Sequence, residues 1–405
     1  MTEKLAVDGG VPVRSAPMPT WPSPSEAQIE AVTATLRSGH INYWTGCEGR
    51  SLELDYAEKL GRAHAIAVAN GTLALELALR AFHIGPRDEV VVPSRGFMAS
   101  ASCVVAVGAR PVFADVDPES SNVTAETLEA ALTKLTSAII VVHVAGWPVE
   151  MDPVIDLARN RGLLVIEDCA HAHGATYRGA PLGSFGDAAC FSFCQDKIVA
   201  AGEGGLLALD DDDAFALAWE YKDHGTSLAK ISDPEFMGRP ASFRWIHDSF
   251  GSNYRMAELE AAMARAGERE LPAAHARRAE LASRLARGIA GVRGLRIPLP
   301  PAHCEHAFYR LYAYVEPAEL AGGWDRDRVL FAIAAEGVPV QYGACAELYR
   351  EEAFVLAGLG PGHRLPGAAR AHETSLAFFV HPTLADSDID DVIAAVRKVM
   401  NVAAR

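Results

Sequence analysis

Between residues 65 and 210, short runs of consecutive apolar residues alternate with segments in which apolar residues recur every three or four positions. The runs have the length of buried strands, and the segments between them have the periodicity of amphipathic helices. Apolar strands separated by helices are typical of an α/β fold with a mostly parallel sheet covered by helices on both faces. Seven strands are expected at 65–70, 89–94, 110–116, 138–144, 163–169, 189–194 and 204–210, with helices that include 72–82, 97–107, 124–134 and 151–160.

After residue 210 the pattern becomes helical, and a long helical stretch at about 255–289 bridges to a second, smaller α+β domain. The segment RIPLPPAH (296–303) is the expected break, followed by a strand at 308–315, a helix at 325–336, a strand in GVPVQYG and a closing helix at 387–400. We divide the chain into an N-terminal segment packing with the small domain (1–24), a large ligand-binding domain (25–270) and a small domain (271–405). In such a sheet, ligands bind beyond the carboxyl ends of the strands.

Composition narrows the classes of partner. The 37 Lys and Arg residues against 52 Asp and Glu give a net charge of −15 without a basic cluster, which argues against nucleic acid. An anionic substrate would need a local cationic pocket. The seven scattered cysteines contain no C-x-x-C pair, which indicates reduced thiols in a cytoplasmic protein and no metal site. A secretory signal and an apolar run of membrane-spanning length are both absent from the sequence, so we expect neither export nor a membrane span.

Lys197 is the first candidate for chemistry. In FSFCQDKIVAAGEGG it lies between two apolar strands and before a glycine-rich turn. An isolated lysine of this kind is usually a surface loop residue. A lysine amine that is partly removed from water, however, is the group that forms Schiff bases with carbonyl compounds.

The run LLVIEDCAHAHGA ends a buried strand with Glu167 and Asp168 at its carboxyl end. Alternation along a strand places the two carboxylates on opposite faces, so they should not share a role. A strand-end aspartate is more often a turn or helix-cap residue than a catalytic one. His171 and His173 have no further ligands placed to complete a metal set, and we favour His171 as a neighbour of a bound cofactor.

The run ANGTLALELAL closes a strand and opens an amphipathic helix at Asn70, Gly71 and Thr72. Free amides at a helix start, a glycine that allows close approach and a hydroxyl together suit a phosphate group. The same three residues also form an ordinary turn with a helix cap. Ser192 is a candidate for a second hydroxyl on the same phosphate.

These elements occur in an order that resembles the DegT/DnrJ/StrS family of sugar aminotransferases, which have the type I aspartate aminotransferase fold. The resemblance extends over nearly the whole chain and includes LRSGHINYWTGCEGRSLE, ANGTLALELAL, DEVVVPSRGFMASA, PVFADVD, HVAGWPVEMDP, IEDCAHAHGA, GSFGDAACFSFCQDKIVAAGEGG, FGSNYRMAELEAAM and HPTL.

The resemblance implies pyridoxal 5′-phosphate as the cofactor, held by the large domain. It makes Lys197 the Schiff-base lysine, Asp168 the partner of the pyridine nitrogen and Phe97 the ring stacked on the cofactor. It also places His171 near the phenolic oxygen of the cofactor. The implied phosphate ligands are Gly71, Thr72, Ser192 and, from the neighbouring subunit, Asn253. That last assignment implies a homodimer with shared active sites.

Departures from the family pattern fall on the side of the amino acceptor. Arg95 replaces a commonly aromatic or small residue, and QYGACAELY replaces a Tyr-x-Pro-x-His element. Arg255 and Tyr342 are further substrate-side candidates. Family relatives with histidine at the position of Lys197 are sugar dehydratases, and lysine here argues for amino transfer.

The resemblance therefore implies transfer of an amino group from glutamate or glutamine to a keto-sugar, most commonly linked to a nucleotide, in amino-sugar or antibiotic biosynthesis. A cyclitol ketone or another carbocycle is an alternative acceptor, because IEDCAHAHG also resembles relatives that act on rings without a nucleotide. A non-catalytic regulator with the same fold is a further alternative.

Overall fold

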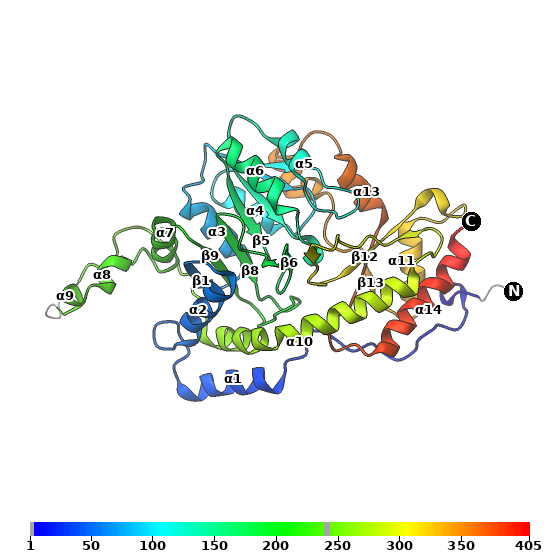
Figure 1. Cartoon of the computed structure of the whole chain (residues 1–405), viewed down its shortest axis with the longest axis horizontal. Coiled ribbons are helices and arrows are strands. Elements are labelled where there is room, and N and C mark those ends of the chain that lie inside the picture. The colour runs from blue at the N-terminus through cyan, green and yellow to red at the C-terminus, as the bar shows by residue number, and fades with distance from the viewer. Residues whose placement is uncertain (1–3, 239–243) are drawn as a thin grey trace.

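The structure is a computed structural model, and it describes residues 4–238 and 244–405. A seven-stranded sheet forms its centre, with the strand order β1-β9-β8-β5-β4-β2-β3 (Figure 1). The five strands from β8 to β3 run parallel, whereas β9 pairs antiparallel with both β1 and β8. The expected seven strands and the mostly parallel sheet are confirmed. The strands are β1 (His64–Val68), β2 (Glu89–Pro93), β3 (Arg110–Ala114), β4 (Thr136–Val142), β5 (Leu164–Asp168), β8 (Ala188–Ser192) and β9 (Gly205–Leu209).

Helices cover this sheet. The helix α3 packs against β8 and β9, α4 packs against β2 and β3, and α2 packs against β1. Burial of apolar side chains drives this packing, since almost every residue of the inner strands is inaccessible to water. The helices around the large sheet are α1 (Glu26–Ser38), α2 (Glu48–Leu60), α3 (Gly71–Ala81), α4 (Ala99–Ala106), α5 (Ala125–Ala131), α6 (Met151–Arg161) and α7 (Asp212–Lys222).

A second, antiparallel sheet has the strand order β10-β12-β14-β13 and its own apolar core with α11 and α14. Its elements are β10 (Leu295–Arg296), β12 (Leu311–Val315), β13 (Val340–Gln341), β14 (Ser375–Phe378), α11 (Arg326–Ala335), α13 (Pro366–Thr374) and α14 (Asp386–Ala403). A small third sheet joins β11 (Cys304–Glu305), β6 (Thr176–Tyr177) and β7 (Ala180–Pro181).

The helix α10 (Glu258–Ile289) spans both cores without a break, as Figure 1 shows along the lower edge of the molecule. Leu271 is buried in the core of the large sheet, and Leu281 and Leu285 are buried in the core of the second. Leu5 also belongs to the second core. The division of the chain at residue 270 stays a prediction.

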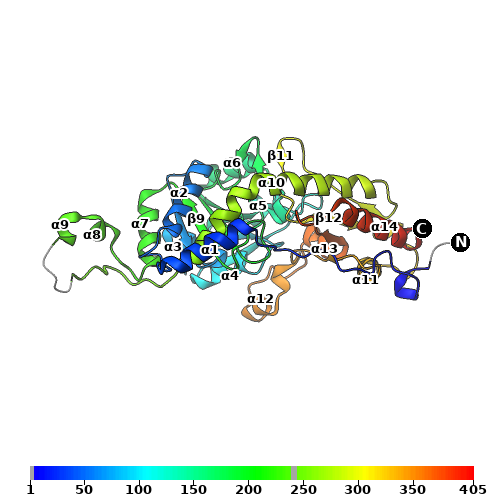
Figure 2. The ribbon, with the colours of Figure 1, turned by 90° about the horizontal axis from the view of Figure 1, so that it is seen from below.

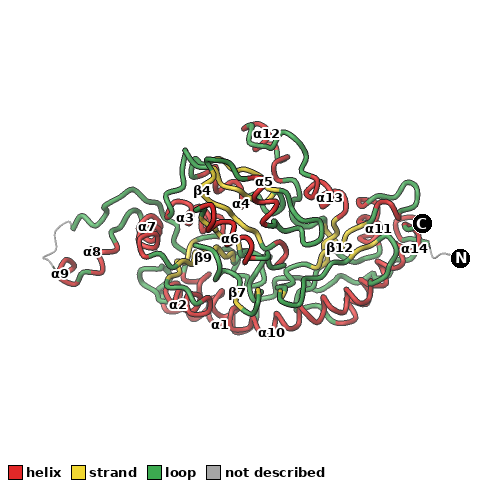
Figure 3. Tube along the Cα trace, turned by 45° about the horizontal axis from the view of Figure 1, so that its top comes forward, coloured by secondary structure: helices red, strands yellow, loops and turns green. Residues whose placement is uncertain are grey.

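Three shorter helices project from this body. Figures 1 and 2 show α8 (Leu228–Ser232) and α9 (Pro234–Met237) extending away from it beyond α7. The helix α12 (Glu352–Ala357) lies on another side of the molecule (Figure 3), where its Phe354 is buried against Phe113 of β3. The helices of the described residues are all too short or too polar to cross a membrane.

Several expected elements are shorter in the structure than predicted, and two of these differences matter for the site. The helix expected at 97–107 begins at Ala99, so Phe97 lies in the turn before it. The strand expected at 308–315 begins only at Leu311. Phe308 adopts a positive φ of 50°, and the amide of Tyr309 donates to the carbonyl of Ala145, so these residues leave the strand direction.

Candidate functional site

Asp168 ends β5 at the carboxyl edge of the sheet and is almost fully buried. Ser100 donates its hydroxyl to Asp168 Oδ2 at 2.7 Å, and the amide of Ala170 donates to Oδ1 at 3.1 Å. Burial raises the pKa of Asp168, although these donors and the nearby charge of Lys197 favour the ionised form. Asp168 forms no ion pair with a described residue, so a cationic group bound beside it would stabilise its carboxylate.

Glu167 has separate partners, as its position on the opposite face of β5 predicts. It accepts the amides of Gly183, Phe185 and Gly186, and His143 lies 3.3 Å away. The charge of Glu167 is therefore satisfied by the protein itself, which indicates a structural role.

Lys197 lies in the loop between β8 and β9, and its side chain is only 14% exposed. Its amide donates to the carbonyl of Cys194 at 2.9 Å, and its carbonyl accepts from Trp21 Nε1 at 2.9 Å. The amine lies 3.5 Å from Asp196 Oδ1 and 5.1 Å from the ring centre of Tyr309. The backbone of Lys197 is thus fixed from two sides, and its amine lies against an aromatic face.

His171 is half-buried, and its ring is stacked on Tyr309 with centres 4.2 Å apart and an interplanar angle of 10°. Burial, and after it the charges of Lys197 and Arg310, lowers the pKa of His171 well below its usual value, so the ring is neutral near pH 7. Its Nδ1 is buried and has no hydrogen-bond partner among the described residues. A buried ring nitrogen without a partner indicates a bound group that supplies one.

His173 differs from its neighbour. Its ring nitrogens are bonded to the hydroxyl of Tyr56 at 3.0 Å and to the carbonyl of Ser192 at 2.9 Å. Burial lowers its pKa to about 3. His173 therefore supports the end of β8, which carries Ser192.

The fold brings together the two segments that the sequence suggested for a phosphate. Gly71 is the first residue of α3, and the side chain of Asn70 caps this helix by accepting the amide of Leu73. A Cβ atom at Gly71 would lie 2.8 Å from Cβ of Ser192, so only glycine permits this approach. Thr72 is exposed beside it. The helix start and Ser192 form one cradle of amides and hydroxyls, which fits an anion.

The remaining cofactor candidates lie at the surface of the chain. Phe97 is 66% exposed in the turn that follows β2. Asn253 is exposed, and its Oδ1 accepts the amide of Arg255 at 3.3 Å. The contribution of Asn253 to a neighbouring subunit stays a prediction.

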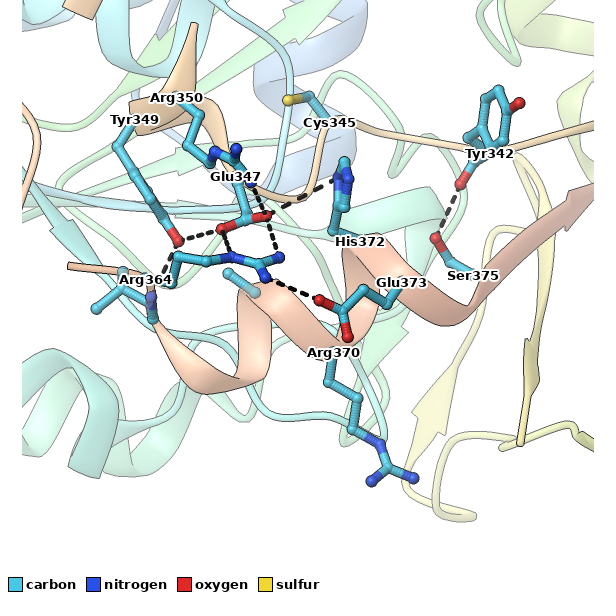
Figure 4. A network of polar contacts seen from close by, with 12 residues as sticks. Tyr342, Cys345, Glu347, Tyr349, Arg350, Arg364, Arg370, His372, Glu373 and Ser375 are labelled. Atoms are coloured by element: carbon cyan, nitrogen blue, oxygen red, sulfur yellow. Dashed lines mark hydrogen bonds and ion pairs between the residues drawn. The ribbon is translucent and has the colours of Figure 1, made fainter. Parts of the chain in front are cut away.

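The three substrate-side candidates have different surroundings. Arg95 is completely buried, with Nη1 donating to Ser121 at 3.0 Å and the guanidinium 4.6 Å from the ring centre of Tyr312. Arg255 Nη1 is 2.6 Å from Asp223. Tyr342 is 42% exposed, and Figure 4 shows its carbonyl accepting from Ser375. The structure does not gather them around one point.

Arg95 is covered by the segment that replaces the Tyr-x-Pro-x-His element. The amide of Gly96 donates to the carbonyl of Cys345 at 3.0 Å, and the amide of Ala344 donates to the hydroxyl of Tyr312 at 2.7 Å. Nε and Nη2 of Arg95 have no partner among the described residues. Arg95 and the segment QYGACAELY that covers it therefore lie in the same part of the site.

A charged network fixes the far end of that segment (Figure 4). The buried carboxylate of Glu347 is bonded to both Nε and Nη2 of Arg364, at 2.9 and 2.7 Å, and Tyr349 donates to it at 2.7 Å. Burial by itself would raise the pKa of Glu347, but the hydrogen bonds from Arg364, Tyr349 and Arg350 outweigh it and lower the pKa to about 2. The segment is therefore held both by this charge pairing and by backbone hydrogen bonds, among them the one from the amide of Leu348 to the carbonyl of Ser94 at 2.9 Å.

The sequence did not single out Tyr309, Asp196 and Ser100. Asp196 directly precedes Lys197, so its proximity could have been noticed. The apolar patterns place Tyr309 in a predicted strand and Ser100 in a predicted helix, and neither belongs to a motif that assigns it to this edge of the sheet.

Two groups of described residues have metal-ligand types close together. In the group of His143, Glu167 and Cys169, the carboxylate is already taken by three backbone amides. In the other, Glu150 is bonded to His303 at 2.8 Å and to Tyr177 at 3.2 Å, beside Cys304. Both groups lie apart from the Lys197 amine and its contacts described above.

Comparison with known proteins agrees with this geometry. Residues 22–397 match the DegT/DnrJ/EryC1/StrS aminotransferase family. An aminotransferase from Psychrobacter cryohalolentis is 42% identical, with a TM-score of 0.92 over 95% of this chain and 100% of that chain.

Two relatives have named substrates. The UDP-N-acetyl-3-dehydro-alpha-D-glucosamine 3-aminotransferase of Acidithiobacillus ferrooxidans is 35% identical, over 88% of this chain and 89% of its own. The L-glutamine:scyllo-inosose aminotransferase of Streptomyces griseus is 32% identical, over 99% and 98%. The chain belongs to the DegT/DnrJ/EryC1/StrS aminotransferase family, whose members are pyridoxal-phosphate-dependent transferases.

Proposed function

We propose that this protein transfers an amino group from glutamate or glutamine to the ketone of a nucleotide-linked sugar. The observation that carries the proposal is the enclosed group of Lys197, Asp168 and His171 at the carboxyl edge of the sheet. The relative from Acidithiobacillus ferrooxidans, named for a UDP-linked keto-sugar, supports this class of acceptor.

The residues present fit pyridoxal phosphate. Lys197 would hold the cofactor covalently through its amine. Asp168 would bond the pyridine nitrogen, because a protonated ring nitrogen supplies the cation that this buried carboxylate lacks. His171 would bond the phenolic oxygen of the cofactor through Nδ1, which has no hydrogen-bond partner among the described residues.

The phosphate would be held by Gly71, Thr72 and Ser192, and the ring of Phe97 would cover the cofactor. Asn253 of a second copy would complete the phosphate site, which requires a homodimer. In this proposal residues 25–270 form the cofactor domain, residues 271–405 form the small domain with which residues 1–24 pack, and the protein works in the cytoplasm.

Pyridoxal phosphate, when bound, supplies an electron-withdrawing ring that stabilises negative charge on the carbon beside the transferred nitrogen. Asp168 would keep the ring nitrogen protonated throughout. The amine of Lys197, once released by the donor, would take the proton from the α-carbon of the donor, and it would return a proton to the acceptor carbon in the second half of the reaction. Arg95, Arg255 and Tyr342 would contact the substrates.

A cyclitol ketone is the second candidate acceptor. It is favoured by the relative from Streptomyces griseus, which is named for scyllo-inosose and matches almost the full length of this chain. Its donor is L-glutamine by name, and we include glutamine among the donors for this protein.

A visible absorption spectrum tests the proposal directly. The cofactor-loaded protein should change its spectrum on addition of glutamate or glutamine, and the original spectrum should return on addition of the correct ketone. A panel of nucleotide-linked keto-sugars and inososes would separate the two classes of acceptor. If the spectrum does not change with any amino donor, the proposed enzymatic activity is contradicted and a non-catalytic regulator becomes the better explanation.

A further inference from the structure

Tyr309 belongs to the segment that leads into the second sheet. It lies just before β12, and its amide is bonded to the carbonyl of Ala145 at 3.0 Å. One face of its ring is stacked on His171, and Arg310 is 4.3 Å from its centre. The ring is therefore held in one orientation.

The hydroxyl of Tyr309 is bonded to Asp196, the residue that directly precedes Lys197. Burial raises the pKa of Tyr309, so the hydroxyl stays protonated and donates to the carboxylate. Burial opposes ionisation of Asp196, but the charge of Lys197 and the Tyr309 hydroxyl outweigh it and lower the pKa of Asp196. Asp196 is thus an anion with one oxygen toward Tyr309 and the other 3.5 Å from the amine of Lys197.

The amine of Lys197 consequently has two neighbours that favour a positive charge. One is the carboxylate of Asp196, and the other is the face of the Tyr309 ring, 5.1 Å from the amine. When an amine takes a proton from carbon it becomes an ammonium ion, and both neighbours stabilise that ion more than the neutral amine.

We propose that Tyr309 and Asp196 are positioning residues, which hold the free amine of Lys197 in place and stabilise the charge that it gains in proton transfer. This inference rests on the proposed function. A purely structural alternative exists, in which the Tyr309–Asp196 bond only ties the segment before β12 to the loop after β8.

The first test uses the cofactor-free protein. Trinitrobenzenesulfonate reacts with neutral amines, and labelling of Lys197 can be followed by peptide mass spectrometry, with the exposed Lys134 as an internal reference. In Asp196→Asn the carboxylate that favours the charged amine is lost, so Lys197 should be labelled at least about threefold faster than in the unaltered protein. Equal labelling would overturn the holding role.

The second test uses the loaded protein and a single turnover with the donor. In Asp196→Asn the rate should fall about tenfold, and in Tyr309→Phe less, while the dissociation constant of the donor stays the same. Deuterium at the α-carbon of the donor should slow both variants more than the unaltered protein, because proton transfer has become the slow step.

The matched control is Tyr177→Phe, which removes a tyrosine hydroxyl bonded to Glu150 at 3.2 Å outside this site. It should change neither the rate nor the isotope effect. If Asp196→Asn and Tyr309→Phe lower only the melting temperature, the structural alternative holds and the inference is wrong. If the unaltered protein converts no donor, the proposed function is wrong. The labelling experiment still tests whether Asp196 and Tyr309 hold the amine of Lys197, because it needs no turnover.

Discussion

Lys197 is half-buried and Arg95 is completely buried; both follow strands of the same sheet, and they differ in what surrounds them. Lys197 has a carboxylate within 3.5 Å and an aromatic face. Arg95 has an aromatic face and the hydroxyl of Ser121, and it forms no ion pair with any residue that the structure describes. The described part of the chain therefore supplies a carboxylate for Lys197 but none for the guanidinium of Arg95.

This difference suggests that Lys197 and Arg95 have different roles. A lysine held by its own chain can lose and regain a bond to a cofactor without moving away. A buried guanidinium without a carboxylate carries a desolvation cost that an anionic ligand would offset. In a chain with a net charge of −15, such a cation is also a suitable place to attract an anionic substrate.

The largest effect is expected for Lys197→Ala. Turnover should fall below detection, and the chromophore that borohydride reduces should disappear, because the covalent attachment and the proton carrier are lost together. Absorption spectra before and after reduction check this. Full activity in the variant would end the assignment of Lys197.

A smaller effect is expected for Arg95→Met, which should not lower the stability of the protein but should weaken substrate binding. Replacing a buried cation that lacks an ion pair by an apolar side chain should leave the melting temperature unchanged or raise it. The KM of one substrate should nevertheless rise about tenfold, since a charged contact is lost. Steady-state kinetics with each substrate varied in turn show which one is affected. A lower melting temperature together with unchanged KM values would make Arg95 structural and would break the comparison with Lys197.

The smallest effect is expected for Arg364→Met, which acts on the segment covering Arg95. The pKa of Glu347 is lowered to about 2 from an unfolded value near 4.3, so its pairing stabilises the folded protein above about pH 4.3 and is lost as the pH falls toward 2. The variant should melt a few degrees lower near pH 7 and show a flatter dependence on pH below 5. Thermal unfolding across this range measures both.

Arg370→Met is the matched control, because Arg370 lies on α13, directly after the loop that carries Arg364, and pairs with Glu316 in a more exposed position. It should leave the pH dependence unchanged. An identical response in both variants would show that Glu347 is not the group that titrates.

Much of the fold could be predicted because the relevant patterns are local. The apolar runs of the seven strands, the cap at Asn70 and the opposite faces of Glu167 and Asp168 follow from neighbouring residues. The start of β12 could not be predicted, because the turn at Phe308 depends on a hydrogen bond between Tyr309 and Ala145, far away in the sequence.

Periodicity and short motifs are enough to predict the seven strands, the family resemblance and the residues at the strand ends. Which side chains share an environment follows from the folded chain alone. Folding brings the ring of Tyr309 to the amine of Lys197, leaves Nδ1 of His171 without a hydrogen-bond partner among the described residues and buries Arg95 beneath the segment after Tyr342. These arrangements depend on contacts between residues that are far apart in the sequence. Such contacts set how deeply each charged group is buried, and therefore the free-energy cost of its charge, and no local sequence pattern contains this information.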